Sequence, residues 1–485
     1  MTLKKLSKNT LVYTVGNIAL RASAFILLPL YSHFLTKNDF GILQTLLFTI
    51  QIMITLIDVG VRTSLVRFLH ESEKEKTLKE LLGSALTINL FSGIILISIS
   101  VTLLLPLFSY FIPKQNIRDL ILLTALAAAV QTFALNIMTY YRAKNLGARF
   151  MMFSLAAAVL LILFTYIFVV IYGMGIKGAL LSLIFSYGIL WVIISGLVYS
   201  GNGISVSSRL IKRLMVFGAP LILAMAGDLM LNTAGSFFLG RFESYEEVAT
   251  YTMAFKIAQI SLIVLIIPFQ LAYEPYVYSN ADNPELKRNI SKITTYLMLA
   301  FLLLSLGIVF VFKDLLALIL GKHFSDSYKL IYFILPGFAF MGLQYIGQSL
   351  LHINNKTNIT GTTVIFFTIT GIILNYFTIK IFGIYGIIFT FNLIMFFTAC
   401  TLILFGQKSF KIEFEYGRLA VIALSFIVLL SISYFLSNFS SIIYYPFFGM
   451  IIVLFITVLY FSEFLTSKEK LLIKSFELSK LFNKS

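Results

Sequence analysis

Long, nearly uninterrupted apolar runs are the feature that most constrains what this chain can fold into. A helix needs about 20 mostly apolar residues to cross the hydrocarbon core of a membrane, and the chain contains about fourteen such runs. Only 12% of its 485 residues are charged, whereas soluble domains carry about 25%. The sequence therefore predicts an all-α membrane protein. The predicted spans lie at about 10–34, 41–66, 82–106, 118–140, 149–172, 176–199, 214–240, 248–273, 290–312, 327–351, 359–380, 384–405, 418–437 and 441–462.

Lysine and arginine residues are concentrated in alternate loops. With the N-terminus in the cytoplasm, most of the 37 basic residues fall on the cytoplasmic side, where such residues are enriched in membrane proteins. An even number of spans then places the C-terminus in the cytoplasm as well. The net charge of +16 thus reflects orientation in the membrane, and we expect no nucleic-acid partner.

Two stretches of the chain match each other weakly at a constant offset. Residues 34–51 align without gaps with 242–259, and each stretch runs from a short acidic turn into a span that contains a glutamine, Gln51 or Gln259. The offset of six spans indicates a parallel repeat, a recurrent design of secondary transporters in which the substrate binds between the halves. Chance similarity of two amphipathic helix starts is the alternative interpretation.

A polar stretch at 201–213 marks the boundary between the halves independently of the repeat. After residue 466, lysines alternate with leucine and phenylalanine, which predicts an amphipathic helix on the membrane surface; a solvated tail is the alternative. The predicted organisation is an N-terminal lobe at 1–200, a cytoplasmic linker at 201–213, a C-terminal lobe at 214–405, two extra helices at 406–466 and the amphipathic tail at 467–485.

Ionisable residues inside predicted spans are the strongest indication of function. A charged group costs about 2.5–3.5 kcal/mol at the membrane centre on insertion scales, so such groups tend to line cavities. Arg21, Arg62 and Lys256 could form a cationic lining for an anionic substrate, because guanidinium and ammonium groups bind phosphate oxygens. Alternatively, Asp58 and Arg62, four residues apart on a helix, could neutralise each other.

A second set of polar residues falls at similar depth in three predicted spans. Asp228, Asn375 and Asn392 together offer one carboxylate and two amide oxygens, which suits a small cation such as Na⁺, or a proton, that couples transport to a gradient. A hydrogen bond between helices is the alternative role for these residues.

Soluble catalytic modules are not apparent. No loop is long enough to hold one, and the sequence contains neither a phosphate-binding loop nor a zinc-binding motif. We expect a transporter rather than an enzyme, with no cofactor.

The opening segment carries a family resemblance. The sequence NTLVYTVGNIALRASAFILLPLYSHFLTKNDFGILQTLL, followed by LIDVGVRTSLVRF, resembles the N-terminal region of Wzx-type flippases. These proteins export bacterial polysaccharides such as O-antigen and belong to the multidrug/oligosaccharidyl-lipid/polysaccharide (MOP) exporter superfamily. The matching features are Arg21 in the first span, LPLYSHFLT with DFG at the turn, and DVG with an arginine near the end of the second span.

The resemblance implies a fold and an activity. The implied fold is a V-shaped bundle of two six-helix lobes plus two C-terminal helices. The implied activity is ion-coupled flipping of an undecaprenyl-diphosphate-linked oligosaccharide across the bacterial cytoplasmic (inner) membrane. In related lipid flippases, cations in the first, second and eighth helices contact the diphosphate, and an aspartate in the seventh joins a sodium site. Arg21 matches the first of these by its position in the helix, and Arg62 and Asp228 match theirs loosely. Lys256 stands where an arginine is expected.

Two other functions stay open. A multidrug exporter of the same superfamily is the nearer alternative, although its cavity would be acidic rather than basic. A membrane polysaccharide polymerase or ligase is the more distant one, because such enzymes hold the acceptor sugar in a large external loop that is missing here. Membrane lipid, a polysaccharide polymerase and chain-length proteins are the expected partners besides the lipid-linked substrate.

Overall fold

The described part of the chain is helical throughout. A computed structural model describes residues 23, 25–112, 114, 116–281, 283–354, 356–461 and 464, with the side chains of 219–232 and 322 left undescribed. Within these ranges there is no β-strand. The chain divides into two compact units, Met1–Ala249 with Thr368–Ile387, and Thr250–Phe367 with Ile388–Ser485. The predicted boundary at 201–213 remains a prediction.

Unit 1 is built around α6 (Ile117–Ala143), which contacts α2, α3, α4, α7 and α8. Several of its buried positions are alanines, including Ala125, Ala128 and Ala134. Small side chains let neighbouring helices approach closely, which is how helices associate when lipid rather than water surrounds them. The other elements of this unit are α2 (Lys37–Asp58), α3 (Val61–Lys74), α4 (Leu78–Thr102), α5 (Leu105–Phe111), α7 (Gly147–Thr165), the π-helical turn Tyr166–Ile171, α8 (Gly175–Asn202) and α9 (Ser208–Phe242).

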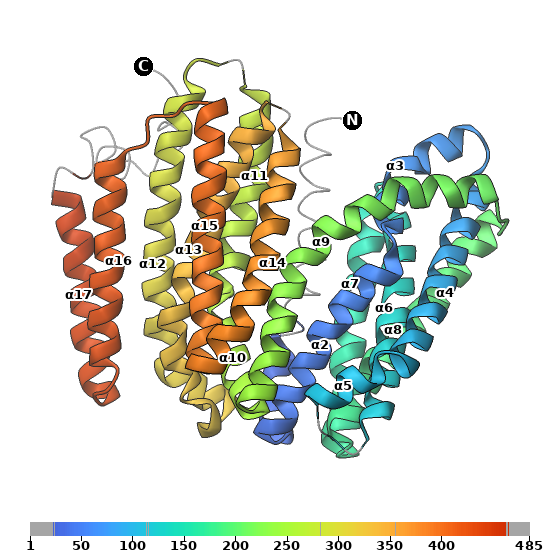
Figure 1. Cartoon of the computed structure of the whole chain (residues 1–485), viewed down its shortest axis with the longest axis horizontal. Coiled ribbons are helices and arrows are strands. Elements are labelled where there is room, and N and C mark those ends of the chain that lie inside the picture. The colour runs from blue at the N-terminus through green and yellow to red at the C-terminus, as the bar shows by residue number, and fades with distance from the viewer. Residues whose placement is uncertain are drawn as a thin grey trace. The chain divides into compact units, whose positions relative to one another are not determined.

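Unit 2 is built around α12 (Leu286–Leu320), which packs against α13 (Ser327–His352), α16 (Tyr416–Leu436) and α17 (Ser441–Phe461). In Figure 1 α16 and α17 form an antiparallel pair beside α12. The unit also contains most of α10 (Tyr245–Ala258), the π-helical turn Leu262–Ile266 and α11 (Ile267–Ser279). Two helices, α14 (Thr357–Phe382) and α15 (Ile384–Ser409), contribute residues to both units.

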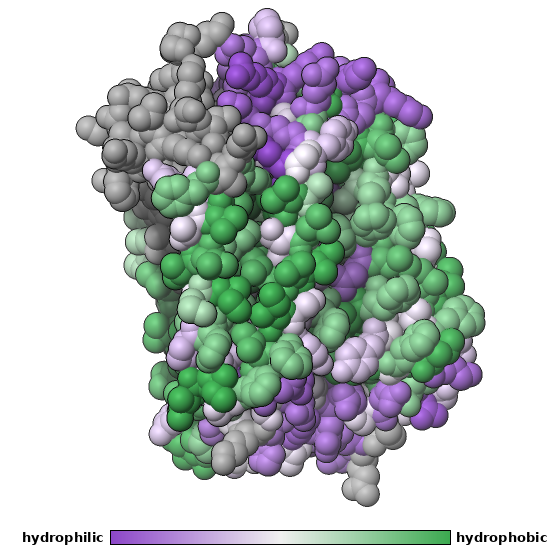
Figure 2. Space-filling model, turned by 90° about the vertical axis from the view of Figure 1, so that its left-hand side faces the viewer, coloured by the Kyte–Doolittle hydropathy of each residue, from purple (hydrophilic) through white to green (hydrophobic). Residues whose placement is uncertain are grey.

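Twelve described segments are long and apolar enough to cross a membrane. The two other predicted spans are only partly described. For the span predicted at 10–34 the described part is an apolar helix over Phe25–Phe34, and the span predicted at 214–240 lies inside the 35-residue helix α9. Figure 2 shows the apolar surface as a broad green zone with purple, hydrophilic residues above and below it. The prediction of an all-α membrane protein is therefore confirmed. The predicted tail helix lies outside the described residues.

The second predicted span, 41–66, is not one continuous helix. It breaks between α2 and α3, where Val59 (φ 47°) and Gly60 (φ 72°) adopt left-handed conformations. The break brings the start of α3 against α9, so that a Cβ atom placed on Gly60 would lie 2.4 Å from the backbone of Gly218. Apolar content could not reveal this break, because apolar residues continue on both sides of it, from Ile57 to Val61 and Leu65.

Replacing Gly60 by alanine is expected to destabilise unit 1. A left-handed conformation costs a residue with a Cβ about 1–2 kcal/mol, and the contact with Gly218 is backbone, which cannot rotate away. We expect a lower melting temperature and less protein in the membrane. Alanine at Gly196, where a Cβ would meet no atom within 4 Å, is the control and should behave like the unmodified protein. Equal stability of the two variants would contradict the prediction.

The polar stretch between α8 and α9 is fixed to unit 1. The amide of Ser205 donates to the carbonyl of Lys79 (3.2 Å), and the hydroxyl of Ser84 exchanges hydrogen bonds with the backbone of Ser207 (3.1 and 3.2 Å). Farther on, Arg213 donates to both carboxylate oxygens of Glu71 at 2.7 and 2.8 Å. The first turns of α9 are thereby held against α3 and α4.

Candidate functional site

Lys256 is a cation without a counter-ion inside unit 2. It lies on α10, next to Phe255, whose ring contacts the rings of Phe338 and Phe391. Lys256 is half-buried, and its ammonium group has no ion pair or hydrogen bond among the described residues. A buried charge is normally paired, since removing it from water is costly. The described residues therefore leave the ammonium group of Lys256 without a partner, and a ligand could contact it.

Asp58 and Arg62 contact each other in unit 1. The Arg62 Nε atom lies 3.4 Å from Asp58 Oδ1, and the same oxygen accepts the backbone N–H of Arg62 at 3.2 Å. The carboxylate thus bridges the break between α2 and α3 and caps the first turn of α3. This contact agrees with mutual neutralisation. It leaves the predicted contact of Arg62 with substrate untested.

The structure describes the side chains of two of the three predicted coupling residues. Asn375 is buried in unit 1 against α9, where a Cβ on Gly235 would lie 3.1 Å from its Nδ2 atom. Asn392 lies in unit 2 and donates from Nδ2 to the carbonyls of Phe333 and Ile388, both at 2.8 Å. Asp228 lies within α9, but its side chain is not described. A cation site formed by these residues remains a prediction.

The remaining predicted site residues are scattered. Gln51 is exposed on α2, and Gln259 is half-buried directly after the end of α10. Arg21 lies outside the described residues.

An apolar cavity of about 600 Å³ lies in unit 2 between α12, α13 and α16. Its polar groups come from Tyr332, Ser431 and Tyr434 alone, and no charged side chain lines it. The apolar lining consists of Met298, Phe301, Phe333, Pro336, Ala339, Phe340, Leu343, Leu419, Ile422, Ala423, Phe426, Ile427 and Leu430. Sequence reasoning missed this cavity, because such residues cannot be distinguished in a span from those that face lipid.

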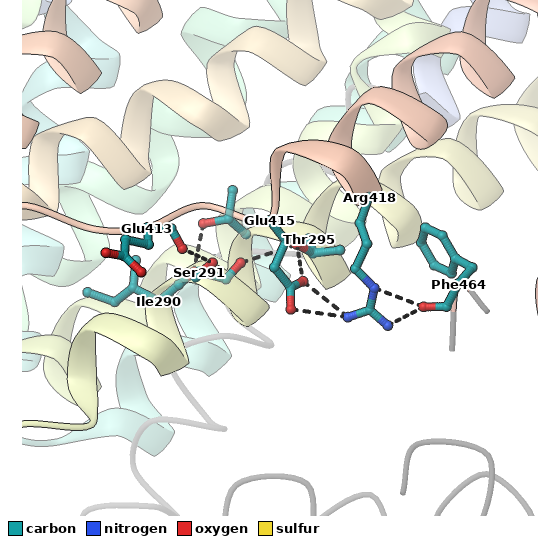
Figure 3. A network of polar contacts seen from close by, with 8 residues as sticks. Ile290, Ser291, Thr295, Glu413, Glu415, Arg418 and Phe464 are labelled. Carbon is teal, nitrogen blue, oxygen red and sulfur yellow. Dashed lines mark hydrogen bonds and ion pairs between the residues drawn. The ribbon is translucent and has the colours of Figure 1, made fainter. Parts of the chain in front are cut away.

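A polar network fixes the first turn of α16, at one end of the cavity (Figure 3). Arg418 donates from Nη1 to both carboxylate oxygens of Glu415 (3.1 and 3.2 Å) and from Nε to the carbonyl of Phe464 (2.8 Å). The Thr295 hydroxyl on α12 donates to the same carboxylate at 2.7 Å, and Ser291 donates to the carbonyl of Glu413, also at 2.7 Å. These bonds join α16 to α12.

A cluster of hydroxyl groups fixes the other end of α16. Tyr332 on α13 hydrogen-bonds to Ser433 on α16 at 2.9 Å, and Ser433 bonds to Tyr444 on α17 at 3.0 Å. Tyr328 contacts the hydroxyls of Tyr332 and Tyr444 and donates to the carbonyl of Val309 on α12 at 2.8 Å. Both ends of the cavity wall are thus anchored by polar groups, partly exposed at the Arg418 end and buried at the Ser433 end, while the wall between them is mostly apolar.

Replacing Arg418 by alanine is expected to loosen this wall. The variant loses hydrogen bonds to Glu415 and Phe464, and bonds of charged groups contribute about 1.5–3 kcal/mol each when well formed. Because Arg418 is partly exposed, we expect a loss near the lower value, seen as a reduced melting temperature in detergent. The exposed Lys411, replaced by alanine, is the matched control. An unchanged melting temperature for the Arg418 variant would show that the network does not stabilise α16.

Two models of known protein families match the chain. The family model described as polysaccharide biosynthesis protein matches residues 6–281, and the model named MatE matches residues 220–377. No curated protein matches the chain significantly in sequence.

Several solved transporters share the fold. An inward-facing multidrug resistance MATE family transporter of the MOP superfamily has a TM-score of 0.61 and 18% identity, over 83% of this chain and 97% of its own. The outward-facing form of such a transporter gives 0.54 and 16%, over 84% and 95%. A MOP superfamily transporter from Pyrococcus furiosus, whose binding pocket is described as having reverse polarity suggesting a different function, gives 0.56 and 15%, over 84% and 95%.

Proposed function

Since the chain belongs to the polysaccharide biosynthesis protein family and is a membrane transporter of the MOP superfamily, we propose that it translocates an undecaprenyl-diphosphate-linked oligosaccharide across the cytoplasmic membrane. The observation that carries this proposal is the presence, in unit 2, of an apolar cavity and of a half-buried cation, Lys256, that has no ion pair among the described residues. A lipid-linked oligosaccharide presents the matching chemistry, an isoprenoid chain joined to a diphosphate.

The cavity between α12, α13 and α16 suits part of an isoprenoid chain. Its volume of about 600 Å³ lies within the range of about 300–1,000 Å³ typical of ligand pockets. A chain in the membrane is already in an apolar environment, so its transfer into the cavity gains little from the hydrophobic effect. The contribution of the cavity is therefore shape and close packing with Phe301, Phe340 and Phe426.

Lys256 suits the diphosphate. Its ammonium group has no competing carboxylate among the described residues, and an ammonium is a compact point charge that attracts phosphate oxygens from several directions. Arg21 and Arg62 are the further cations proposed to contact the diphosphate, and Asp228 with Asn375 and Asn392 is the proposed coupling site.

Export of drugs is the second candidate function. It is favoured by the match of residues 220–377 to the MatE model and by the shared fold of transporters described as multidrug resistance proteins. Cationic drugs, however, would be repelled by an unpaired Lys256. A neutral or anionic drug is the form of this alternative that the charge permits.

Reconstitution into vesicles distinguishes the two functions. The purified chain is placed in liposomes with a fluorescent undecaprenyl-diphosphate oligosaccharide, and the fraction of the label that a membrane-impermeant quencher reaches is followed over time. We expect the chain to accelerate the exchange between leaflets, and a deletion strain to lose surface polysaccharide without becoming sensitive to drugs. Drug sensitivity with normal polysaccharide would contradict the proposal.

A further inference from the structure

Two buried asparagines line a small cavity in unit 1. Asn89 on α4 and Asn136 on α6 are each 3% exposed, and both line a cavity of about 20 Å³. The cavity also touches Phe133, Trp191 and Tyr199. The rings of Phe133 and Trp191 are 5.3 Å apart, so the indole forms part of one wall.

The amide groups at this cavity have unused hydrogen-bonding capacity. Asn89 Oδ1 and both amide atoms of Asn136 are buried and have no hydrogen-bond partner among the described residues. Buried polar atoms are nearly always paired, because an unpaired one loses the bond it made to water in the unfolded chain. Two acceptor atoms and one donor atom without partners therefore belong to two residues that line the same small cavity.

We propose that this cavity binds one water molecule that bridges Asn89 and Asn136. A water needs about 10–15 Å³ of such space and usually makes about three hydrogen bonds, so about 20 Å³ admits one water and not two. The water donates to Asn89 Oδ1 and Asn136 Oδ1 and accepts from Asn136 Nδ2, which satisfies all three atoms. No charged side chain lines the cavity, so a neutral ligand fits better than a cation.

The bridging water would join α4 to α6 beside α8, among side chains that are mostly apolar. Polar bridges between membrane helices replace the hydrophobic force that is missing between them. The proposed water thus acts as an internal fastener of unit 1, independent of the transport function proposed for the chain.

A structure of the full chain in nanodiscs, at a resolution that shows ordered waters, tests the proposal directly. We expect a density peak within hydrogen-bonding distance of Asn89 Oδ1 and of both Asn136 amide atoms. A direct bond between the two asparagines, or a cavity without density, would overturn it.

Leucine substitutions test the proposal in solution. Asn89→Leu and Asn136→Leu each leave the opposite amide without a partner, so each should lower the melting temperature. The double variant removes both amides and leaves a dry apolar space, so its loss should be smaller than the sum of the single losses. Additive losses would overturn the proposal, and the double variant keeps the test valid if a single variant does not fold.

The only tryptophan of the chain reports on the site, because Trp191 lines the cavity. Its emission should move to shorter wavelength in the double variant, which lacks the amides and the water. Asn392→Leu changes a half-buried asparagine of unit 2 and is the control, which should leave the emission unchanged. A shift when choline is replaced by Na⁺ would indicate a cation in the cavity and would overturn the assignment to water.

Discussion

Lys256→Met is expected to slow export of the surface polysaccharide about ten- to hundred-fold while leaving the protein at least as stable as before. In unit 2 Lys256 is half-buried and has no ion pair among the described residues, and partial removal of an unpaired charge from water is unfavourable for folding. Methionine has a similar length and no charge, so it removes that cost. Losing a charge-assisted contact of about 1.5–3 kcal/mol with the diphosphate corresponds to about a ten- to hundred-fold slower translocation. The vesicle assay and a thermal melt measure the two effects.

Two further variants make this result specific. Lys256→Arg keeps the charge and should retain part of the activity, whereas Lys411→Met removes an exposed lysine of the same unit and should change nothing. A Lys256→Met protein that translocates at the normal rate would remove Lys256 from the substrate site. A variant that loses both activity and stability would instead assign Lys256 a structural role.

Filling the cavity between α12, α13 and α16 is the second change with a large expected effect. Ala423 lines this cavity on α16, so Ala423→Trp places an indole in the space proposed for the isoprenoid chain. We expect translocation to fall at least tenfold in the vesicle assay. The protein should stay folded, because the added ring enters existing space rather than a packed core.

The neighbouring residue provides the control. Leu424 is 64% exposed and does not line the cavity, so Leu424→Trp adds an indole to a different face of the same helix. This variant should translocate normally. Equal rates for the two tryptophan variants would exclude the cavity as a lipid site, and equal losses would point to a general effect on α16.

The sequence predicted the individual helices well because the signal for a span is local. Twelve of the described segments are apolar and long enough to cross a membrane, as expected from their runs of apolar residues. The break at Gly60 was missed, since a left-handed turn leaves hydropathy unchanged and depends on the close approach of Gly218, far along the chain.

The sequence predicted the candidate site only where a charged residue falls inside an apolar span. Lys256 stood out because lysine is rare within a span, and the spacing of Asp58 and Arg62 correctly suggested that they could pair. The aromatic residues of the cavity gave no such signal. Their composition is that of any membrane helix, so only their position against α12 and α13 identifies them.

The sequence by itself determined that this chain is a bundle of membrane-spanning helices, and its opening motifs indicated the superfamily. Hydropathy decides this, because an apolar run of sufficient length is stable in a membrane whatever its neighbours are. Only the tertiary structure decided where cavities form and where hydrogen bonds join one helix to another. The Thr295 hydroxyl donates a hydrogen bond to Glu415, which lies 120 residues further along the sequence. Asn89 and Asn136, on different helices, line the same cavity. Such contacts depend on how helices pack, which no local pattern encodes.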